Sequence, residues 1–467
     1  MKNITTLLFA TIMFIAITAS AQNYQSCAHC NMYIKDFNHN ATMIQNGVAS
    51  NFDAIECLVN YIKDKTIAED TKLTIADYES GLQIDAKTAY YLKSKAIPSP
   101  MGANLSGFET EEKAKEYKKK KGGDIYNWEE LKARFDDSKF GAVPHHHHNH
   151  FRPDAHAPIG VAGDHLHPQG GLMVSYKAML MNMSGNLSGS DKIADEEIFN
   201  EYMNSPQEMD MVMHMVGVMY APSDKITLML MQNFVTNSMD MTHSMTMMDG
   251  MKMKEDFSTS STGFGDLKAS VLLALYNSAS NSVHLNAGMS LPVGSVTERD
   301  NTAMKDNAKL PYPMQLGSGT VDFMLGATYK KSFTSGSIGA QVMGTHRTGN
   351  SSEGYQLGDM AEVNIWGAVN LTDMFSLSAR VQGAVAEDIS GRDRDLMPMM
   401  APPANTANYG HERINGFLGL NMIFDHDSKF NKLRLGVEAG MPIYQHVNGI
   451  QMNQKYTVNC GVKYSIL

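Results

Sequence analysis

Segments of about ten residues in which apolar and polar positions alternate recur through the C-terminal two-thirds of the chain. In the first of them, Leu172, Val174 and Tyr176 share one face, while Ser175 and Lys177 share the other. The segments lie near 172–183, 208–221, 224–235, 266–277, 281–292, 319–330, 335–346, 359–371, 374–384, 411–423, 432–442 and 456–466. This repeated alternation predicts an antiparallel transmembrane β-barrel of about twelve strands.

The connections between these segments alternate in length. Long connections fall at 184–207, 236–264, 293–317 and 385–410, and short ones at Pro222–Ser223, Asn277–Ser280, Ser332–Ser335 and 425–431. Outer-membrane barrels have short periplasmic turns and long external loops. A soluble all-β protein would show the same alternation but explains this rhythm less well. We therefore expect residues 170–467 to form a barrel in the outer membrane, in contact with its lipid.

The N-terminal part divides into three stretches. Residues 1–21 have a charged start, a short apolar run and a small-residue site at Ala19-Ser20-Ala21, which is typical of a secretory signal. Residues 22–141 form a separate domain, and residues 142–169 form a His-rich linker without periodicity. The net charge of -10 gives no indication of nucleic-acid binding. We expect the domain at 22–141 to lie in the periplasm.

A thiol and thioether motif opens this domain: Cys27 and Cys30 form a C-x-x-C pair, and Met32 follows at once. Soft sulfur ligands select Cu(I), although a C-x-x-C pair alone also fits thiol redox chemistry. The thioether of Met32 favours Cu(I). Because no second C-x-x-C is present, a closed four-thiolate zinc site is not expected.

Residues from about 25 to 136 resemble the NosL family, the copper-binding accessory proteins of nitrous-oxide reductase. The matching pieces are Cys27-x-x-Cys30-x-Met32, Asn51-Phe52-Asp53, Asp85-Ala86, Ala89-Tyr90, Ser99-Pro100-Met101-Gly102, Phe108, Ala114, Tyr117 and Gly122-Gly123. The resemblance implies a small α+β domain that binds one Cu(I), with Cys30 and Met32 as first ligands and Cys27 next. Met101 is either a further ligand or buried packing. For Cys57, on an amphipathic helical pattern, a core thiol is the favoured interpretation.

The chain contains 37 methionines, and they are concentrated between residues 173 and 253. On the first three strands they share the polar face, which in a transmembrane barrel is the lumen. The predicted lumen-lining methionines are Met179, Met181, Met183, Met209, Met211, Met213, Met215, Met229 and Met231. Flexible packing is the alternative interpretation, but a thioether-lined lumen suits a soft cation such as Cu(I) or Ag(I).

Two further clusters carry metal-binding residue types. One is expected in an exposed, flexible external loop and comprises Met239, Met241, His243, Met245 and Met247. The other lies in the linker, with its imidazoles at His145, His146, His147, His148 and His150, followed by His156 and the Asp164-His165-Leu166-His167 stretch. His-rich tracts are candidate metal sites.

These features together predict an outer-membrane copper-handling protein that passes Cu(I) between a periplasmic domain and a methionine-lined barrel. The alternatives are a porin-like channel or transporter for another solute, and a membrane-anchored chaperone for a periplasmic cuproenzyme. Thiol oxidoreduction is a weaker option. A copper exporter or a cuproenzyme is the expected protein partner. No catalytic motif stands out, so enzymatic activity is not expected.

Overall fold

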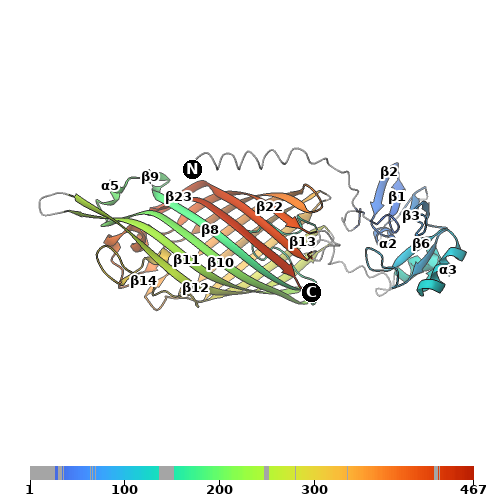
Figure 1. Cartoon of the computed structure of the whole chain (residues 1–467), viewed down its shortest axis with the longest axis horizontal. Coiled ribbons are helices and arrows are strands. Elements are labelled where there is room, and N and C mark those ends of the chain that lie inside the picture. Colours follow the sequence, from blue (N-terminus) through green and yellow to red (C-terminus); the bar gives the residue numbers. More distant parts are fainter. Residues whose placement is uncertain are drawn as a thin grey trace. The chain divides into compact units, whose positions relative to one another are not determined.

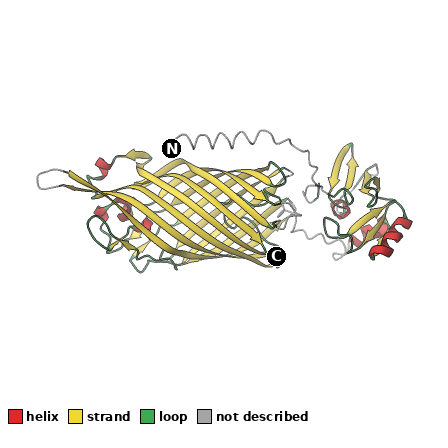
Figure 2. Cartoon of the chain, viewed as in Figure 1, coloured by secondary structure: helices red, strands yellow, loops and turns green. Residues whose placement is uncertain are grey.

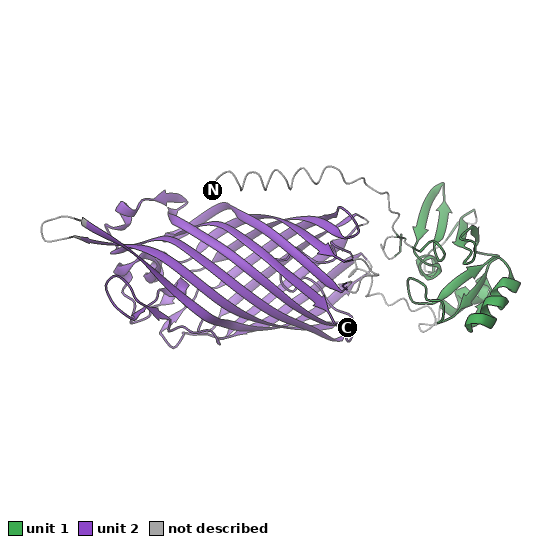
Figure 3. Ribbon diagram, viewed as in Figure 1, with its two compact units in different colours: residues 1–150 green, residues 151–467 purple. Residues whose placement is uncertain are grey.

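The structure is a computed structural model that describes residues 27–135 and 152–466, apart from Lys35, Asp64, Thr66, Glu69, Ala279, Thr334, Asn431 and the ranges 30–33, 247–251 and 425–429. The chain forms two compact units, Met1–His150 and Phe151–Leu467, shown in Figure 3. Each is described here by itself. The predicted signal at 1–21 lies outside the described residues.

The first unit is a small α+β domain with two sheets (Figures 1 and 2). Its elements are β1 (Ala41–Gln45), β2 (Val48–Phe52), α2 (Ile55–Ile62), β3 (Lys72–Ala76), β4 (Gln83–Asp85), β5 (Tyr90–Lys93), β6 (Leu105–Phe108), α3 (Glu111–Lys121), β7 (Asp124–Tyr126) and α4 (Trp128–Phe135). One sheet has the order β2-β1-β3-β4, and the other has the order β6-β5-β7. The α+β fold predicted for this part is confirmed.

Helix α2 supplies much of the core of this domain. Its apolar residues recur at helical spacing, so that Ile55, Leu58, Val59 and Ile62 are all buried. Helix α3 is different, because among its side chains only Ala114 is buried and its lysines lie in solvent. No described helix is long and apolar enough to cross a membrane.

The second unit is a closed antiparallel barrel. The strands of its wall are β8 (Leu172–Gly189), β10 (Asn204–Ser223), β11 (Ile226–Thr246), β12 (Lys252–Asn277), β13 (Asn281–Leu291), β16 (Asp322–Ser332), β17 (Gly336–Arg347), β19 (Met360–Asn370), β20 (Phe375–Ala386), β22 (His411–Ile423) and β23 (Leu433–Ser465). They pair in this order around the ring, and pairing between β8 and β10 closes it.

Strand β23 crosses the wall twice. It bends near Gly449, where φ is +60°; residues before the bend pair with β22, and residues after it pair with β8. With its two arms counted separately, the wall has the twelve crossings that the alternation predicted. Because that number is even, β8 begins and β23 ends at the same end of the barrel, where Met173 pairs with Ser465. This is called the short-turn end below.

The outer surface of the barrel is apolar around the ring. Large exposed hydrophobic side chains include Val216, Leu230, Leu325, Ile365 and Leu418, which lie on five different strands. Soluble proteins rarely expose a continuous apolar surface of this kind. The apolar band and the closed ring together are the construction of a transmembrane barrel of the outer-membrane type.

The opposite, long-loop end carries irregular loops and short elements. These are β9 (Asp191–Ile193), α5 (Asp195–Ile198), β14 (Arg299–Asp300), β15 (Ala308–Lys309), η2 (Tyr312–Met314), β18 (Tyr355–Gln356), β21 (Ser390–Gly391), η3 (Pro398–Met400), η4 (Pro402–Ala404) and η5 (Thr406–Asn408). The ammonium of Lys309, whose side chain is 1% exposed, lies 2.9 Å from Glu353 and 3.0 Å from Asp393. Loops from different hairpins are therefore joined to one another at this end.

The long external loop predicted at 236–264 is largely a β-hairpin instead. Strands β11 and β12 continue to Thr246 and from Lys252, in register from Met245 opposite Met253 to Thr236 opposite Thr262. This stretch is rich in serine, threonine and aspartate, a composition typical of a loop. They are compatible with a strand here because the outer face of a strand meets water where it extends beyond the membrane.

The predicted linker at 142–169 also differs from the structure, in which residues 152–169 belong to the barrel unit. We call this segment the plug. Its backbone is hydrogen-bonded by side chains of Lys177, Thr227, His284, Lys330, Ser337, Gln341 and Arg434. These residues come from β8, β11, β13, β16, β17 and β23, which are spread around the ring, so the plug lies inside the lumen. The lack of periodicity in this segment correctly predicted an irregular backbone. It did not show whether the segment lies in solvent or is bound through its carbonyl groups by the barrel wall.

Candidate metal centres and the barrel lumen

The sulfur ligands predicted in the first unit are only partly described. Cys27 is buried, and its neighbour Ala28 donates its backbone N–H to Asn51 on β2 at 2.8 Å. Met101 is 1% exposed and belongs to the same apolar core as Cys27 and Cys57. Cys30 and Met32 lie outside the described residues. The structure thus places Cys27 and Met101 within one core, and it leaves their role as ligands a prediction.

A buried carboxylate holds the turn that carries Met101. Glu56, on α2, accepts hydrogen bonds from the Ser99 hydroxyl and, at 3.2 Å, from the Ala103 N–H. The backbone N–H of Asn104 donates to the Ser99 hydroxyl at 2.8 Å, which ties both sides of the turn together. Burial raises the pKa of Glu56 above its ordinary value of 4.5, and the Ser99 hydrogen bond offsets this only in part.

The second feature is a continuous set of inward-facing methionines on β8, β10 and β11, which we call the methionine wall. It comprises Met173, Met179, Met181, Met183, Met209, Met211, Met213, Met215, Met219, Met229, Met231, Met239 and Met241. All nine of the predicted lumen-lining methionines belong to it. Their neighbours along each strand, such as Val216 and Leu230, are exposed on the outer surface.

Strand register sets these methionines side by side. Met209 of β10 pairs with Met183 of β8 and with Met239 of β11. At the short-turn end, Met219 pairs in the same way with Met173 and Met229. Between these two rungs, Met211 pairs with Met181, and Met213 pairs with Met179. In the two remaining rungs only one residue is a methionine, Met215 beside Lys177 and Met231 beside Gly217. Residues directly opposite each other in a sheet have Cβ atoms about 5 Å apart, so paired thioethers lie close together in the other rungs.

At the long-loop end the methionine wall is covered by the loops. Met209, Met239 and Met241 pack in one apolar cluster with Met314 of η2 and Met452 of β23. The cluster also includes Leu310 and Ala401, from two different loops.

The expectation of an exposed, flexible Met/His loop is therefore wrong for Met239, Met241 and His243, which are buried on β11. The His243 Nδ1 lies 2.8 Å from Asn204 Oδ1. Met245 is exposed on the same strand, whereas Met247 lies outside the described residues. The imidazoles of His145–His148 and His150 lie outside them as well.

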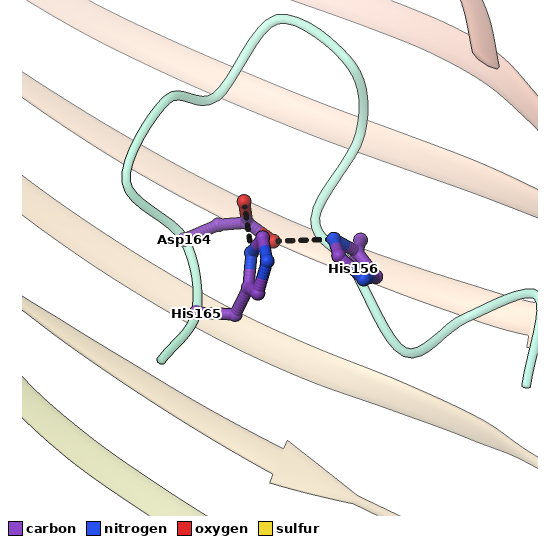
Figure 4. A group of neighbouring side chains, drawn as sticks. All are labelled: His156, Asp164 and His165. Carbon is purple, nitrogen blue, oxygen red and sulfur yellow. Dashed lines mark hydrogen bonds and ion pairs between the residues drawn. The ribbon is translucent and has the colours of Figure 1, made fainter. Parts of the chain in front are cut away.

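The plug carries a compact group of imidazoles and one carboxylate, seen in part in Figure 4. Asp164 Oδ1 lies 2.9 Å from His165 Nδ1, and Asp164 Oδ2 accepts the backbone N–H of Ala157 at 2.8 Å. His165 Nε2 lies 3.2 Å from His167 Nε2. His156 Nδ1 is 3.8 Å from Asp164. Ligand atoms of His156, Asp164 and His165 all fall within 4.8 Å of one another.

Strands β20 and β23 bring a polar and charged group into the lumen. Arg380 of β20 forms a buried ion pair with Glu438 of β23 at 2.5 Å and donates to Asn364 at 2.6 Å. Asn459 donates to Glu438 at 3.0 Å. Gly160 of the plug is packed directly against the Arg380–Glu438 pair, with no space for a β-carbon.

The comparisons with known proteins separate the same two parts. The family model NosL matches residues 18–135. This matched part is called the NosL domain. The solved copper chaperone NosL from Shewanella denitrificans is 18% identical, covering 24% of this chain and 95% of its own, with a TM-score of 0.22. No curated protein sequence matches the chain.

Solved outer-membrane proteins match the rest of the chain. The COG4313 outer membrane channel from Pseudomonas putida F1 is 14% identical over 66% of this chain and 99% of its own, with a TM-score of 0.44. A FadL homologue from Pseudomonas aeruginosa is 9% identical over 67% of this chain and 92% of its own, with a TM-score of 0.31. The family match at residues 18–135 agrees with the resemblance that the sequence indicated for this part.

Several lumenal residues were not recognised from the sequence as one site. Met239 and Met241, which were expected in an external loop, belong to the methionine wall, as do Met173 and Met219, which alternate on the same strands as the predicted lumen-lining methionines. Lys463 also enters the lumenal site, with its ammonium 3.3 Å from Asp164. No sequence signal links these two positions, which are 299 residues apart. The NosL match covers residues 18–135 and does not extend to these barrel residues.

Proposed function

We propose that this protein handles copper at the outer membrane, with its NosL domain binding Cu(I) in the periplasm and exchanging it with the methionine wall of the barrel. The observation that carries the proposal is the series of inward methionines on β8, β10 and β11, in which each rung from Met219 to Met209 contains at least one methionine. Thioethers are soft ligands that suit Cu(I). The NosL domain precedes β8 in the chain, and β8 begins at the short-turn end. With that end in the periplasm, as in other outer-membrane barrels, the domain lies in the periplasm as well.

The site in the NosL domain is proposed to consist of Cys30 and Met32, with Cys27 and Met101 as further candidates. Full-length protein in detergent should bind Cu(I) under reducing conditions. The double variant Cys30→Ser/Met32→Leu should lose this binding at the domain. Cys460→Ser, an exposed thiol of the barrel, is the control and should bind as the unmodified protein does.

The barrel part is tested by copper uptake into proteoliposomes. A variant carrying Met211→Leu, Met213→Leu and Met231→Leu keeps side-chain volume but removes three thioethers from the lumen. Cu(I) uptake should fall, whereas the flux of a small neutral sugar should not change. Met289→Leu replaces an exposed methionine on the outer surface and serves as the control. Undiminished copper uptake in the triple variant would contradict the proposal, as would equal copper content in cells with and without the gene.

A channel for another solute is the second candidate function. It is favoured by Arg380 and the plug-binding Lys177, Lys330 and Lys463, which put positive groups in the lumen. Such a lumen suits an anionic or polar solute. Sugar or anion flux that exceeds copper flux and ignores the methionine substitutions would support this second function.

A further inference from the structure

The plug contains two imidazole nitrogens held at the separation that a shared metal ion requires. His165 Nε2 and His167 Nε2 are 3.2 Å apart. Two ligands bound to one ion at about 2.0–2.1 Å, at angles between 90° and 109°, lie roughly 2.9–3.4 Å apart. The distance also fits an N–H···N hydrogen bond, which a metal ion would replace.

Asp164 sets the chemical state of the nearer imidazole. A carboxylate only accepts hydrogen bonds, so its contact of 2.9 Å with His165 Nδ1 places the proton of a neutral ring on that nitrogen. The lone pair of His165 Nε2 then points toward His167. Metal-binding histidines commonly have such a carboxylate behind them, because it fixes both the tautomer and the ring orientation.

The barrel holds this arrangement in place. His165 and His167 are 6% and 5% exposed. The backbone around them is fixed by His284, 2.9 Å from the Gly163 carbonyl, and by Thr227, which accepts the N–H of His167 at 3.1 Å. A site positioned in this way requires little reorganisation to bind an ion.

Space for an ion lies next to His165. A cavity of about 50 Å³ is lined by Asp164, His165 and five methionines of the wall: Met173, Met215, Met219, Met229 and Met231. A single water needs about 10–15 Å³ by the same measure, so an ion with a bound water fits. Water or a thioether can therefore complete the coordination that two imidazoles leave open.

The carboxylate oxygen that contacts His165 already has a cation beside it. The Lys463 ammonium lies 3.3 Å from Asp164 Oδ1 and 3.4 Å from His156 Nδ1. An ion between His156 and Asp164 would have to displace this ammonium. The His165–His167 side is therefore the better position, with Asp164 acting as the orienting group rather than as a ligand.

We propose that His165 and His167 bind a divalent transition-metal ion, Cu²⁺ or Zn²⁺, inside the barrel lumen. Imidazole nitrogen suits these borderline ions, in contrast to the soft Cu(I) expected at thiolate and thioether groups. The inference goes beyond the proposed function. It needs neither Cu(I) binding by the NosL domain nor copper transport, and either can fail without the other.

The test uses the full-length protein in detergent, in a background that silences the other candidate ligands. That background carries Cys27→Ser, Cys30→Ser, Met32→Leu, and asparagine at positions 145–148 and 150. Titration with Cu²⁺ should show one bound equivalent. The electron paramagnetic resonance spectrum of the bound Cu²⁺ should show two equatorial nitrogen ligands. Zn²⁺ added in excess should displace the Cu²⁺. Failure to bind either ion in this background would overturn the proposal.

Single substitutions then assign the ligands. His165→Asn and His167→Asn should each weaken Cu²⁺ binding at least tenfold, and Asp164→Asn should weaken it by about 10–100-fold. His346→Asn, at a side chain 70% exposed outside the lumen, is the matched control and should have no effect. Unchanged affinity after either imidazole is removed would overturn the assignment.

A gain of affinity provides a test that misfolding cannot imitate. Lys463→Gln removes the positive charge beside Asp164, and the apparent Cu²⁺ affinity should rise severalfold because cation–cation repulsion is lost. Weaker binding in Lys463→Gln, in protein whose barrel still resists unfolding on a gel, would count against the site.

Discussion

The two sides of the barrel lumen are built from different chemistry. On β16, β17, β20 and β23 several inward side chains are amides or charged groups that bond to one another or to the plug, as the Arg380–Glu438 pair and Gln341 do. On β8, β10 and β11 they are mainly methionines stacked in register. The polar side is accounted for by the plug, whose backbone carbonyls need donors inside the barrel.

Lys177 of β8 and Thr227 of β11 also bind the plug, but the methionines of these strands have no such structural requirement. A thioether is a weak acceptor, and leucine would fill similar space. Packing alone therefore does not explain why thirteen positions on three adjacent strands hold the same residue. The polar side chains therefore hold the plug in place, and the methionines are the candidates for ligand binding.

Breaking the ion pair of the polar side should have the largest effect on stability. Glu438→Gln leaves the guanidinium of Arg380 buried without its counter-charge, which costs about 3–5 kcal/mol. Urea unfolding followed by the fluorescence of Trp366, with Trp128→Phe to remove the signal of the NosL domain, measures it. The double variant Arg380→Gln/Glu438→Gln should recover part of the loss. A loss below about 1 kcal/mol in the single variant would show that the pair is not buried as described.

The contact between the plug and this pair should be next in size. Gly160→Ala places a methyl group against Arg380 and Glu438, and overpacking of this kind costs about 1–3 kcal/mol. Displacement of the plug should also raise single-channel conductance in planar bilayers. Gly383→Ala, where a β-carbon meets no other atom, is the control. Conductance equal to that of the control would mean that the plug does not limit the lumen.

A matched pair of substitutions compares the two sides directly. Gln341→Leu removes the donor to the Ala162 carbonyl and to Thr328, and should cost about 1–3 kcal/mol. Met213→Leu on the opposite side should cost less than about 1.5 kcal/mol. Both are measured by the same urea titration. Equal costs would remove the distinction between a structural and a ligand-based side.

Glu56 of the NosL domain extends the comparison to a carboxylate with fewer partners. Unlike Glu438, it has one buried oxygen, Oε2, with no hydrogen-bond partner among the described residues, and burial raises its pKa. Its contribution to stability is full below its ordinary value of 4.5 and is lost as pH rises through the raised pKa of the folded state.

The free energy of unfolding of the domain should therefore fall with rising pH in this range, and it should fall less in Glu56→Gln. Because the effect depends on a single carboxyl group, it is the smallest one expected. Trp128 fluorescence during urea unfolding at several pH values, with Trp366→Phe, measures it. Identical pH dependence in both proteins would exclude Glu56 as the cause.

From the sequence alone we could predict the two-part organisation, the twelve crossings of the barrel and the inward methionines. It could do so because a strand has a strict period of two, so that alternation alone assigns each residue to a face. The NosL domain was recognisable because its motif, Cys27 to Met32, and the Ser99–Gly102 stretch stand in a specific order.

The sequence did not predict the position of residues 152–169 or the length of the hairpin at 236–264, and both are seen in the three-dimensional structure. An irregular segment has no periodicity from which to read burial, so its partners are fixed by contacts between distant residues such as Asp164 and Lys463. The hairpin was missed because polar residues on the outer face of a strand beyond the membrane look like a loop. The grouping of Asp164, His165 and five methionines of the wall around one cavity follows from closure of the ring, which no local pattern encodes.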